Sequence, residues 1–112
     1  MSRSAALNAL VNVSIPVPEA ISNLAHFPWD SDSDLIVLCL GDCVEVLSRF
    51  VRGELAKADV EAWANALECR EDIGYANSTV RALLHELANP LLTLKLTPHR
   101  ANLLLARIQE VS

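Results

Sequence analysis

Residues 57–68 have the sequence KADVEAWANALE, and this stretch decides the fold class. Its apolar side chains recur with the spacing i, i+3, i+4 and i+7, at Val60, Trp63, Ala64 and Leu67. This spacing places them on one face of an α-helix and leaves the polar residues on the other. We therefore predict a helix over 57–68, with Trp63 as the anchor of the hydrophobic core.

Three further amphipathic helices surround this one in the sequence. Residues 42–52 carry apolar side chains on one face and end at Gly53, a residue type that commonly stops helices. A third helix begins at Ser78 and ends before Pro90, and a fourth opens with the capping pair Thr97-Pro98. Four such helices with short links predict an all-α fold, a compact helical bundle whose core spans residues 42–110.

The N-terminal region, residues 1–34, has a weaker pattern. Ser4 can cap a short helix that runs through Val11, and Pro18 can occupy the first turn of another. The sequence therefore predicts short N-terminal helices in addition to the four main ones.

Two short apolar segments leave their structure open. Residues 35–40, LIVLCL, fit either a buried strand or the first turns of a buried helix. Residues 92–96, LTLKL, alternate strictly between apolar and polar side chains. If both segments are extended, they can pair as a minor two-stranded β ribbon, 35–40 with 92–96.

Composition places the chain among single-domain proteins. It has 112 residues, 52% of them hydrophobic, and a mean hydropathy of +0.28, values that exclude intrinsic disorder and predict one domain over 1–112. The longest apolar run has six residues, whereas a membrane span needs about 20. No export signal is recognisable at the N-terminus, and three cysteines, an odd number, suggest buried thiols in a reducing cytoplasm.

Charge is distributed unevenly along the chain. The net charge is −5, yet residues 30–72 hold eleven acidic residues against four basic ones, a net −7, while residues 73–112 have a net charge of +2. Nucleic-acid binding is not expected, because an acidic segment repels phosphate. Either these residues form an acidic surface that binds a basic protein partner, or they only keep the protein soluble. The candidate partner-binding residues are Trp29, Asp30, Asp32, Asp34, Glu54, Asp59, Glu61, Glu68, Glu71 and Asp72.

Signatures of enzymes and metal proteins are weak. The pair His85-Glu86 lacks the second histidine of a zinc-protease motif, because position 89 is Asn89. No cluster of four metal ligands, no serine nucleophile with its base and no phosphate-binding loop is recognisable, so no cofactor is expected. Glu68, Glu71 and Asp72 would do acid–base chemistry only in a pocket, and with Arg70 among them we expect an exposed loop instead.

Surplus apolar surface suggests self-association as an alternative. Leu91 and Leu103 lie off the apolar faces of the predicted helices, and a chain this rich in apolar residues must expose some of them or share them with another chain. A homodimer is therefore a second hypothesis.

Several segments of the chain resemble known proteins. LSRFVRGEL at 47–55, DVEAWANALE at 59–68 and REDI at 70–73 resemble small, uncharacterised bacterial all-helical proteins, over about residues 35–108. The hairpin at 49–54 is similar, more loosely, to that of colicin-like immunity proteins, acidic helical bundles that neutralise a basic toxin domain. The chain departs from this pattern at Ala56, where a serine or threonine cap is usual, and no functional residue can be transferred. The resemblance implies a bacterial helical protein, and in its looser form an immunity or inhibitor role rather than an enzyme.

Overall fold

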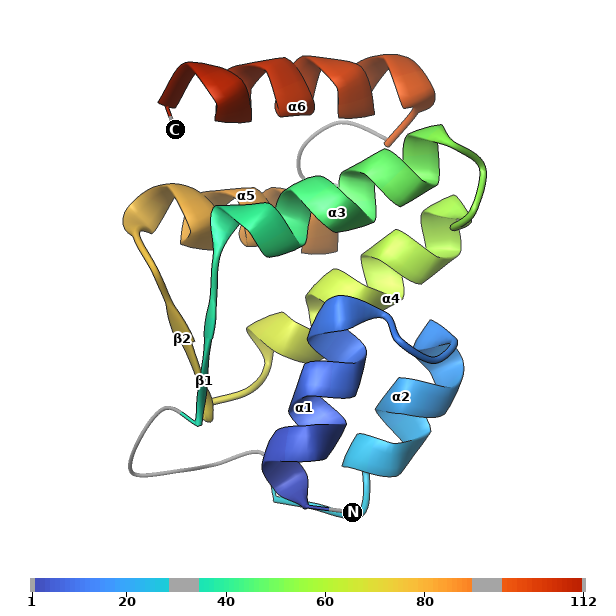
Figure 1. The fold of residues 1–112 in the computed structure, drawn as a ribbon, viewed down its shortest axis with the longest axis vertical. Coiled ribbons are helices and arrows are strands. Elements are labelled where there is room, and N and C mark those ends of the chain that lie inside the picture. The colour runs from blue at the N-terminus through green and yellow to red at the C-terminus, as the bar shows by residue number, and fades with distance from the viewer. Residues whose placement is uncertain (1, 29–34, 90–95, 112) are drawn as a thin grey trace.

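The computed structural model describes residues 2–28, 35–89 and 96–111 of the chain (Figure 1). In those ranges the protein is mainly helical, with a small two-stranded sheet, as the sequence predicts. The elements in chain order are α1 (Arg3–Asn12), α2 (Val17–Leu24), β1 (Ile36–Leu38), α3 (Leu40–Val51), α4 (Lys57–Glu68), β2 (Ile73–Tyr75), α5 (Ser78–Ala88) and α6 (Pro98–Val111).

Helix α4 lies at the centre of the core and spans the predicted residues. All four apolar residues of its predicted inner face are fully shielded from solvent. The indole Nε1 of Trp63 donates a hydrogen bond of 3.0 Å to the backbone carbonyl of Leu10 in α1, 53 residues earlier. The prediction of Trp63 as core anchor is confirmed, and the contact also ties α1 to the core.

The N-terminal helices form a hairpin that packs on α4 and α3. The cap of α1 is Ser2, two residues before the predicted cap Ser4, because Ser2 accepts the hydrogen bond from the Ala5 amide at 3.1 Å. The helix ends at Asn12, and the following Val13 has the left-handed backbone conformation with φ 49°. Because Leu7 and Leu10 are completely buried, the weakly patterned N-terminal region is an integral part of the fold.

Helix α3 begins at Leu40, two residues before its predicted start. The Asp42 carboxylate accepts a hydrogen bond of 2.9 Å from the Cys39 amide and so satisfies a donor at the helix start. Gly53 follows the helix with φ +80°, the conformation expected of a stop. The prediction of buried thiols holds for Cys43 only, because Cys39 precedes this helix and Cys69 follows α4 at positions that leave both exposed.

The small sheet is parallel and pairs β1 with β2, with Ile36, Val37 and Leu38 opposite Ile73, Gly74 and Tyr75. The segment 35–40, for which the sequence left strand or helix open, contains the strand at 36–38 and, after Cys39, the first residue of α3. In the described chain the partner of β1 is 73–75, which the sequence analysis did not predict as a strand. Of its predicted partner 92–96, residues 92–95 lie outside the described residues.

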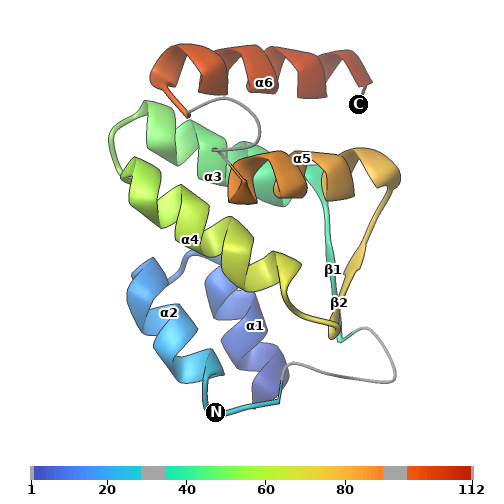
Figure 2. The same ribbon diagram turned by 180° about the vertical axis from the view of Figure 1, so that it is seen from behind.

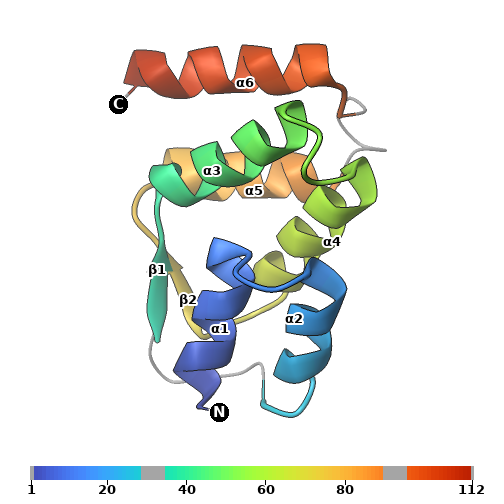
Figure 3. The ribbon, with the colours of Figure 1, turned by 45° about the vertical axis from the view of Figure 1, so that its right-hand side comes forward.

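The last two helices complete the bundle, with α6 lying across α3 above α5 (Figure 3). Asn77, one residue before the predicted cap Ser78, accepts a hydrogen bond from the Val80 amide at 3.0 Å at the start of α5. Thr97 caps α6 as predicted, accepting a hydrogen bond from the Arg100 amide at 3.1 Å. Ala101, Leu104 and Ile108 are buried, so α6 turns an apolar face toward the core.

Candidate partner-binding surface

The predicted acidic surface divides into residues that the structure describes and residues that it does not. Trp29, Asp30, Asp32 and Asp34 lie outside the described residues. The remaining six candidates lie on α4 or on the turns before and after it. Their surroundings differ so much that they cannot act as one surface.

Glu54, in the turn between α3 and α4, is engaged by neighbouring arginines. Its carboxylate forms an ion pair with Arg52 and a longer one of 3.8 Å with Arg49. The hydrogen bond from Arg52 is the main cause of a lowered Glu54 pKa. Arg49 also donates a hydrogen bond of 2.9 Å to the Val13 carbonyl, so this cluster helps to hold the α1–α2 hairpin on the bundle.

Asp59 acts on the backbone at the start of α4. Its carboxylate accepts a hydrogen bond of 2.9 Å from the Ala56 amide, as a third residue of a helix commonly does. Alanine at position 56 has no side-chain acceptor, so this helix start has only the half of a capping box that Asp59 provides. Because its carboxylate already accepts a hydrogen bond at the helix start, Asp59 is a weaker candidate for contact with a partner.

Glu68, near the end of α4, faces α5. Its Oε1 lies 3.1 Å from His85 Nδ1, and the imidazole is 60% exposed. The other oxygen, Oε2, is buried and has no hydrogen-bond partner among the described residues. Glu61 lies two turns before Glu68 on α4 and is half-buried. Glu71 lies after the end of α4 and is exposed. Neither carboxylate forms an ion pair with another described residue.

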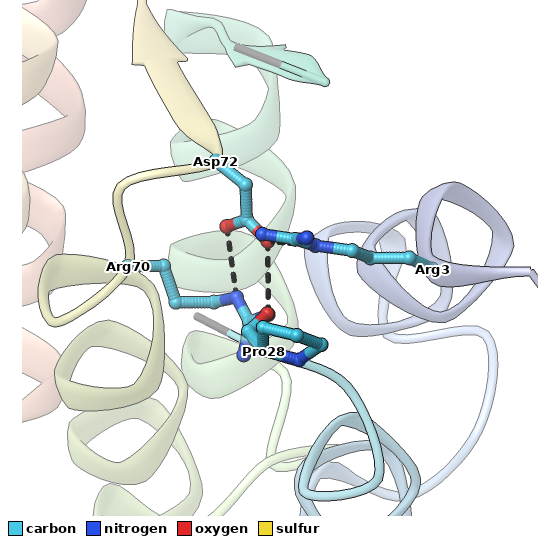
Figure 4. Close-up of polar contacts among 4 residues, drawn as sticks. All are labelled: Arg3, Pro28, Arg70 and Asp72. Atoms are coloured by element: carbon cyan, nitrogen blue, oxygen red, sulfur yellow. Dashed lines mark hydrogen bonds and ion pairs between the residues drawn. The ribbon is translucent and has the colours of Figure 1, made fainter. Parts of the chain in front are cut away.

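Asp72 contradicts its prediction as an exposed partner-binding residue, because its side chain is completely buried. Arg3 Nε lies 2.8 Å from Asp72 Oδ2, while Arg70 donates from Nε to Oδ1 and from Nη2 to Oδ2, both at 2.9 Å (Figure 4). Arg70 Nη2 also donates to the Pro28 carbonyl at 2.8 Å. Burial raises the pKa of Asp72, but the hydrogen bonds from Arg70 and Arg3 outweigh it and hold the pKa below its ordinary value.

This cluster joins three distant parts of the chain: the start of α1, the segment that follows α2, and the segment between α4 and β2. The two arginines surround one carboxylate, so Asp72 is a structural ion-pair centre rather than a contact for a basic partner. The sequence does not reveal this cluster, because Arg70 and Asp72, two residues apart, are typical of an exposed ion pair. The second arginine, Arg3, is 69 residues away from Asp72.

An apolar hollow beside this cluster was not predicted from the sequence. It has a volume of about 470 Å³ and lies between α2 and the C-terminal end of α4, which run side by side in Figure 2. The α2–α4 hollow is lined by Ile21, Leu24, Ala25, Ala66, Cys69 and Arg70. The feature of the sequence that points to this hollow is Ala66, because a larger side chain at this position of α4 would fill the space.

Chemical groups for catalysis do not converge in the described part of the chain. Over residues 2–28, 35–89 and 96–108, no group of three or more potential metal-binding side chains lies together. Burial raises the pKa of the Cys43 thiol to about 12, so this cysteine is not a ready nucleophile. None of the described helices has the length and apolar character needed to traverse a lipid bilayer.

Comparison of the chain with protein-family models, curated proteins and solved structures gave no significant match. The resemblance to bacterial helical proteins and to immunity proteins therefore stays a prediction. Function has to be argued from the surface itself.

Proposed function

We propose that this protein is a non-enzymatic helical domain that binds a basic protein partner through α4 and the α2–α4 hollow. The observation that carries the proposal is the hollow itself, an apolar depression of about 470 Å³ with the exposed Glu71 next to its lining residue Arg70. Binding sites commonly combine such an apolar depression with a few polar groups at its edge.

An acidic residue next to the hollow supplies a charge that a basic partner would recognise. Glu71 follows directly after Arg70, a lining residue, and is exposed. Glu61 and Glu68 lie two turns apart on the flank of α4 that faces α5, not on the side that lines the hollow. A partner that places an apolar side chain in the hollow would reach the Glu71 carboxylate with a neighbouring lysine or arginine, which steers its approach and fixes its orientation.

An immunity or inhibitor role is the sharpest form of this proposal. In that form the partner is a basic toxin domain, and binding blocks its activity. Its support is the looser resemblance of the 49–54 hairpin and the net charge of −5.

The experiment is affinity capture from the native host, followed by titration of the purified captured protein. We compare the wild type with Ala66→Glu, which places a charge in the hollow, and with Glu71→Lys. Glu19→Lys, an exposed residue of α2 outside the lining of the hollow, is the matched control.

The expected partner is basic, binds more weakly as salt rises, loses at least about tenfold in affinity with Ala66→Glu, and loses less with Glu71→Lys. The proposal would be contradicted by a captured protein that is acidic, that binds independently of salt, or that binds both test variants as tightly as the wild type.

Self-association through β1 is a second candidate. Leu35 and Val37 are 39% and 53% exposed and lie on the same side of the strand. A dimer that covers them would dissociate on replacement of Val37 by serine. Light scattering over a concentration series measures this directly, and a wild type that stays monomeric at all concentrations would eliminate it.

A further inference from the structure

Among the described residues that line the α2–α4 hollow, Arg70 is the one with a charge, and the others carry apolar side chains or, at position 69, a thiol. The Arg70 side chain is 9% exposed, so its guanidinium is largely shielded from bulk water. Two of its nitrogens are already engaged: Nε and Nη2 donate to the Asp72 carboxylate, and Nη2 donates also to the Pro28 carbonyl (Figure 4). These bonds fix the position of the guanidinium beside the hollow.

The third nitrogen of this guanidinium, Nη1, has two N–H donors and no acceptor in the described part of the chain. Nη1 is therefore the nitrogen with which Arg70 can bind a molecule in the hollow. The strongest acceptor for it is a carboxylate, because hydrogen bonds between charged groups gain strength where water is scarce. A ligand that combines an apolar group with a carboxylate would use both features of the site.

The charges beside the hollow have opposite signs at neighbouring positions. Arg70 lines the hollow, and the next residue, Glu71, is exposed and lies outside the lining. An internal lysine-rich or arginine-rich segment matches Glu71 but brings no acceptor of negative charge to Arg70. The last residue of a basic chain matches both, because its α-carboxylate is negative, the residues before it are positive, and its own side chain can be apolar.

We propose that the α2–α4 hollow binds the C-terminal residue of the basic partner. The apolar side chain of that residue occupies the hollow, its α-carboxylate accepts hydrogen bonds from Arg70 Nη1, and a lysine or arginine before it pairs with Glu71. The volume of the hollow, about 470 Å³, lies within the range of about 300–1,000 Å³ that is typical of pockets for small ligands. This inference rests on the function proposed above, because it names the part of the partner that enters the hollow.

The test compares two peptides of about six residues that are rich in lysine and end in leucine, one with a free C-terminal carboxylate and the other with a C-terminal amide. Cys69 reports binding, because its thiol is exposed and lines the hollow. The whole protein is alkylated with iodoacetamide at increasing peptide concentration, and mass spectrometry gives the rate at each cysteine. Cys39 is the internal control, since it is exposed and lies outside the lining of the hollow.

The free acid should slow the alkylation of Cys69 but not that of Cys39, with an affinity at least about tenfold higher than that of the amide. Net charge alone predicts the opposite order, because the amide is the more positive peptide and the protein has a net charge of −5. Ala66→Leu, which fills the hollow, should abolish the protection of Cys69. Asn65→Leu, which adds the same side chain at the exposed neighbouring position outside the lining, should preserve it.

Equal protection by the two peptides that is lost in Ala66→Leu would overturn the inference and leave the proposed function in place, since the hollow would then bind a basic chain without its carboxylate. Absence of protection, protection that survives in Ala66→Leu, or tighter binding of the amide would also overturn the inference. The proposed function fails on a different observation, a captured partner whose affinity does not respond to Ala66→Glu.

Discussion

Replacing Asp72 by asparagine tests the clearest structural assignment in the protein. The carboxylate is completely buried and accepts three contacts of 2.8–2.9 Å from Arg3 and Arg70. Asparagine has nearly the same shape, but it is neutral and keeps only one acceptor oxygen. The substitution therefore leaves two guanidinium groups facing an amide, while the packing changes little.

The expected loss of stability follows from the burial of the two arginines. The side chain of Arg70 is 9% exposed and that of Arg3 is 21% exposed, so only the second can recover much hydration. Breaking a buried pair by removing one partner costs about 3–5 kcal/mol. Because asparagine keeps one acceptor and Arg3 can turn toward water, we expect the lower end, about 3 kcal/mol.

Urea unfolding followed by circular dichroism measures this loss. With a denaturant slope of about 1.5 kcal/mol per molar, the unfolding midpoint should fall by about 2 M. Glu71→Gln is the control, since this neighbouring side chain is exposed and its replacement should change the free energy of unfolding by less than about 0.5 kcal/mol.

The dependence on pH has a definite sign. The Asp72 pKa is lower in the folded protein than its ordinary value, so the ion pairs stabilise the fold above the unfolded pKa, which is about 4. This contribution is lost as pH falls through the folded pKa. The difference in stability between wild type and Asp72→Asn should therefore be largest near neutral pH and shrink below about pH 4.

A double-mutant cycle with Arg3→Gln decides whether the pairing itself is responsible. The two single substitutions should be coupled by about 1–3 kcal/mol, because the residues share one contact. A loss below about 1 kcal/mol for Asp72→Asn, or additive effects in the cycle, would refute the assignment of Asp72 as an ion-pair centre.

Three further predictions concern other parts of the fold. Trp63→Phe removes the buried indole N–H that bonds to an α1 carbonyl and leaves a void, so unfolding should become easier by about 2–3 kcal/mol, measured by urea titration. A thiol reagent should modify Cys39 and Cys69 in the folded protein, but Cys43 only after unfolding, as counted by mass spectrometry; three thiols modified without denaturant would contradict its burial. Thr97→Ala should cost about 1 kcal/mol by removing the cap of α6, and Thr97→Ser should restore most of it.

The elements that the sequence predicted well are those with contrast between their faces. Helix α4 alternates charged and apolar residues with helical spacing, and its bounds are as predicted. Helix α1 lacks such contrast, because alanines occupy exposed positions such as Ala5 as well as the buried position Ala6. Its place in the core depends on the hydrogen bond from Trp63, and no local pattern indicates a contact across 53 residues.

The strand β2 was missed for a different reason. Residues 73–75 are only three in number and have a glycine in the middle, so neither length nor alternation distinguishes them from a loop. Their extended conformation comes from pairing with β1, whose residues precede them by 37 positions. Tertiary pairing of this kind has no signal in a short segment read by itself.

The candidate surface shows most clearly why charge counted along the chain differs from charge in space. The segment 30–72 has a net charge of −7, yet Arg49 and Arg52 neutralise Glu45 and Glu54, and a third carboxylate, that of Asp72, is buried between two arginines. Asp42 and Asp59 bond to backbone amides at helix starts. Carboxylates that already have partners contribute little to the attraction of another protein.

Charge alone is therefore too weak an explanation for partner binding at α4. An exposed ion pair of Glu61 or Glu71 with a partner is worth about 0–1 kcal/mol and is screened by salt. A buried apolar side chain of leucine or phenylalanine size contributes about 1.5–3 kcal/mol, so the α2–α4 hollow would supply more of the affinity than either carboxylate. If this is the binding surface, Ala66→Glu should reduce affinity more than Glu71→Lys, and added salt should weaken binding without abolishing it. The reverse order would mean that the acidic residues, and not the hollow, determine recognition.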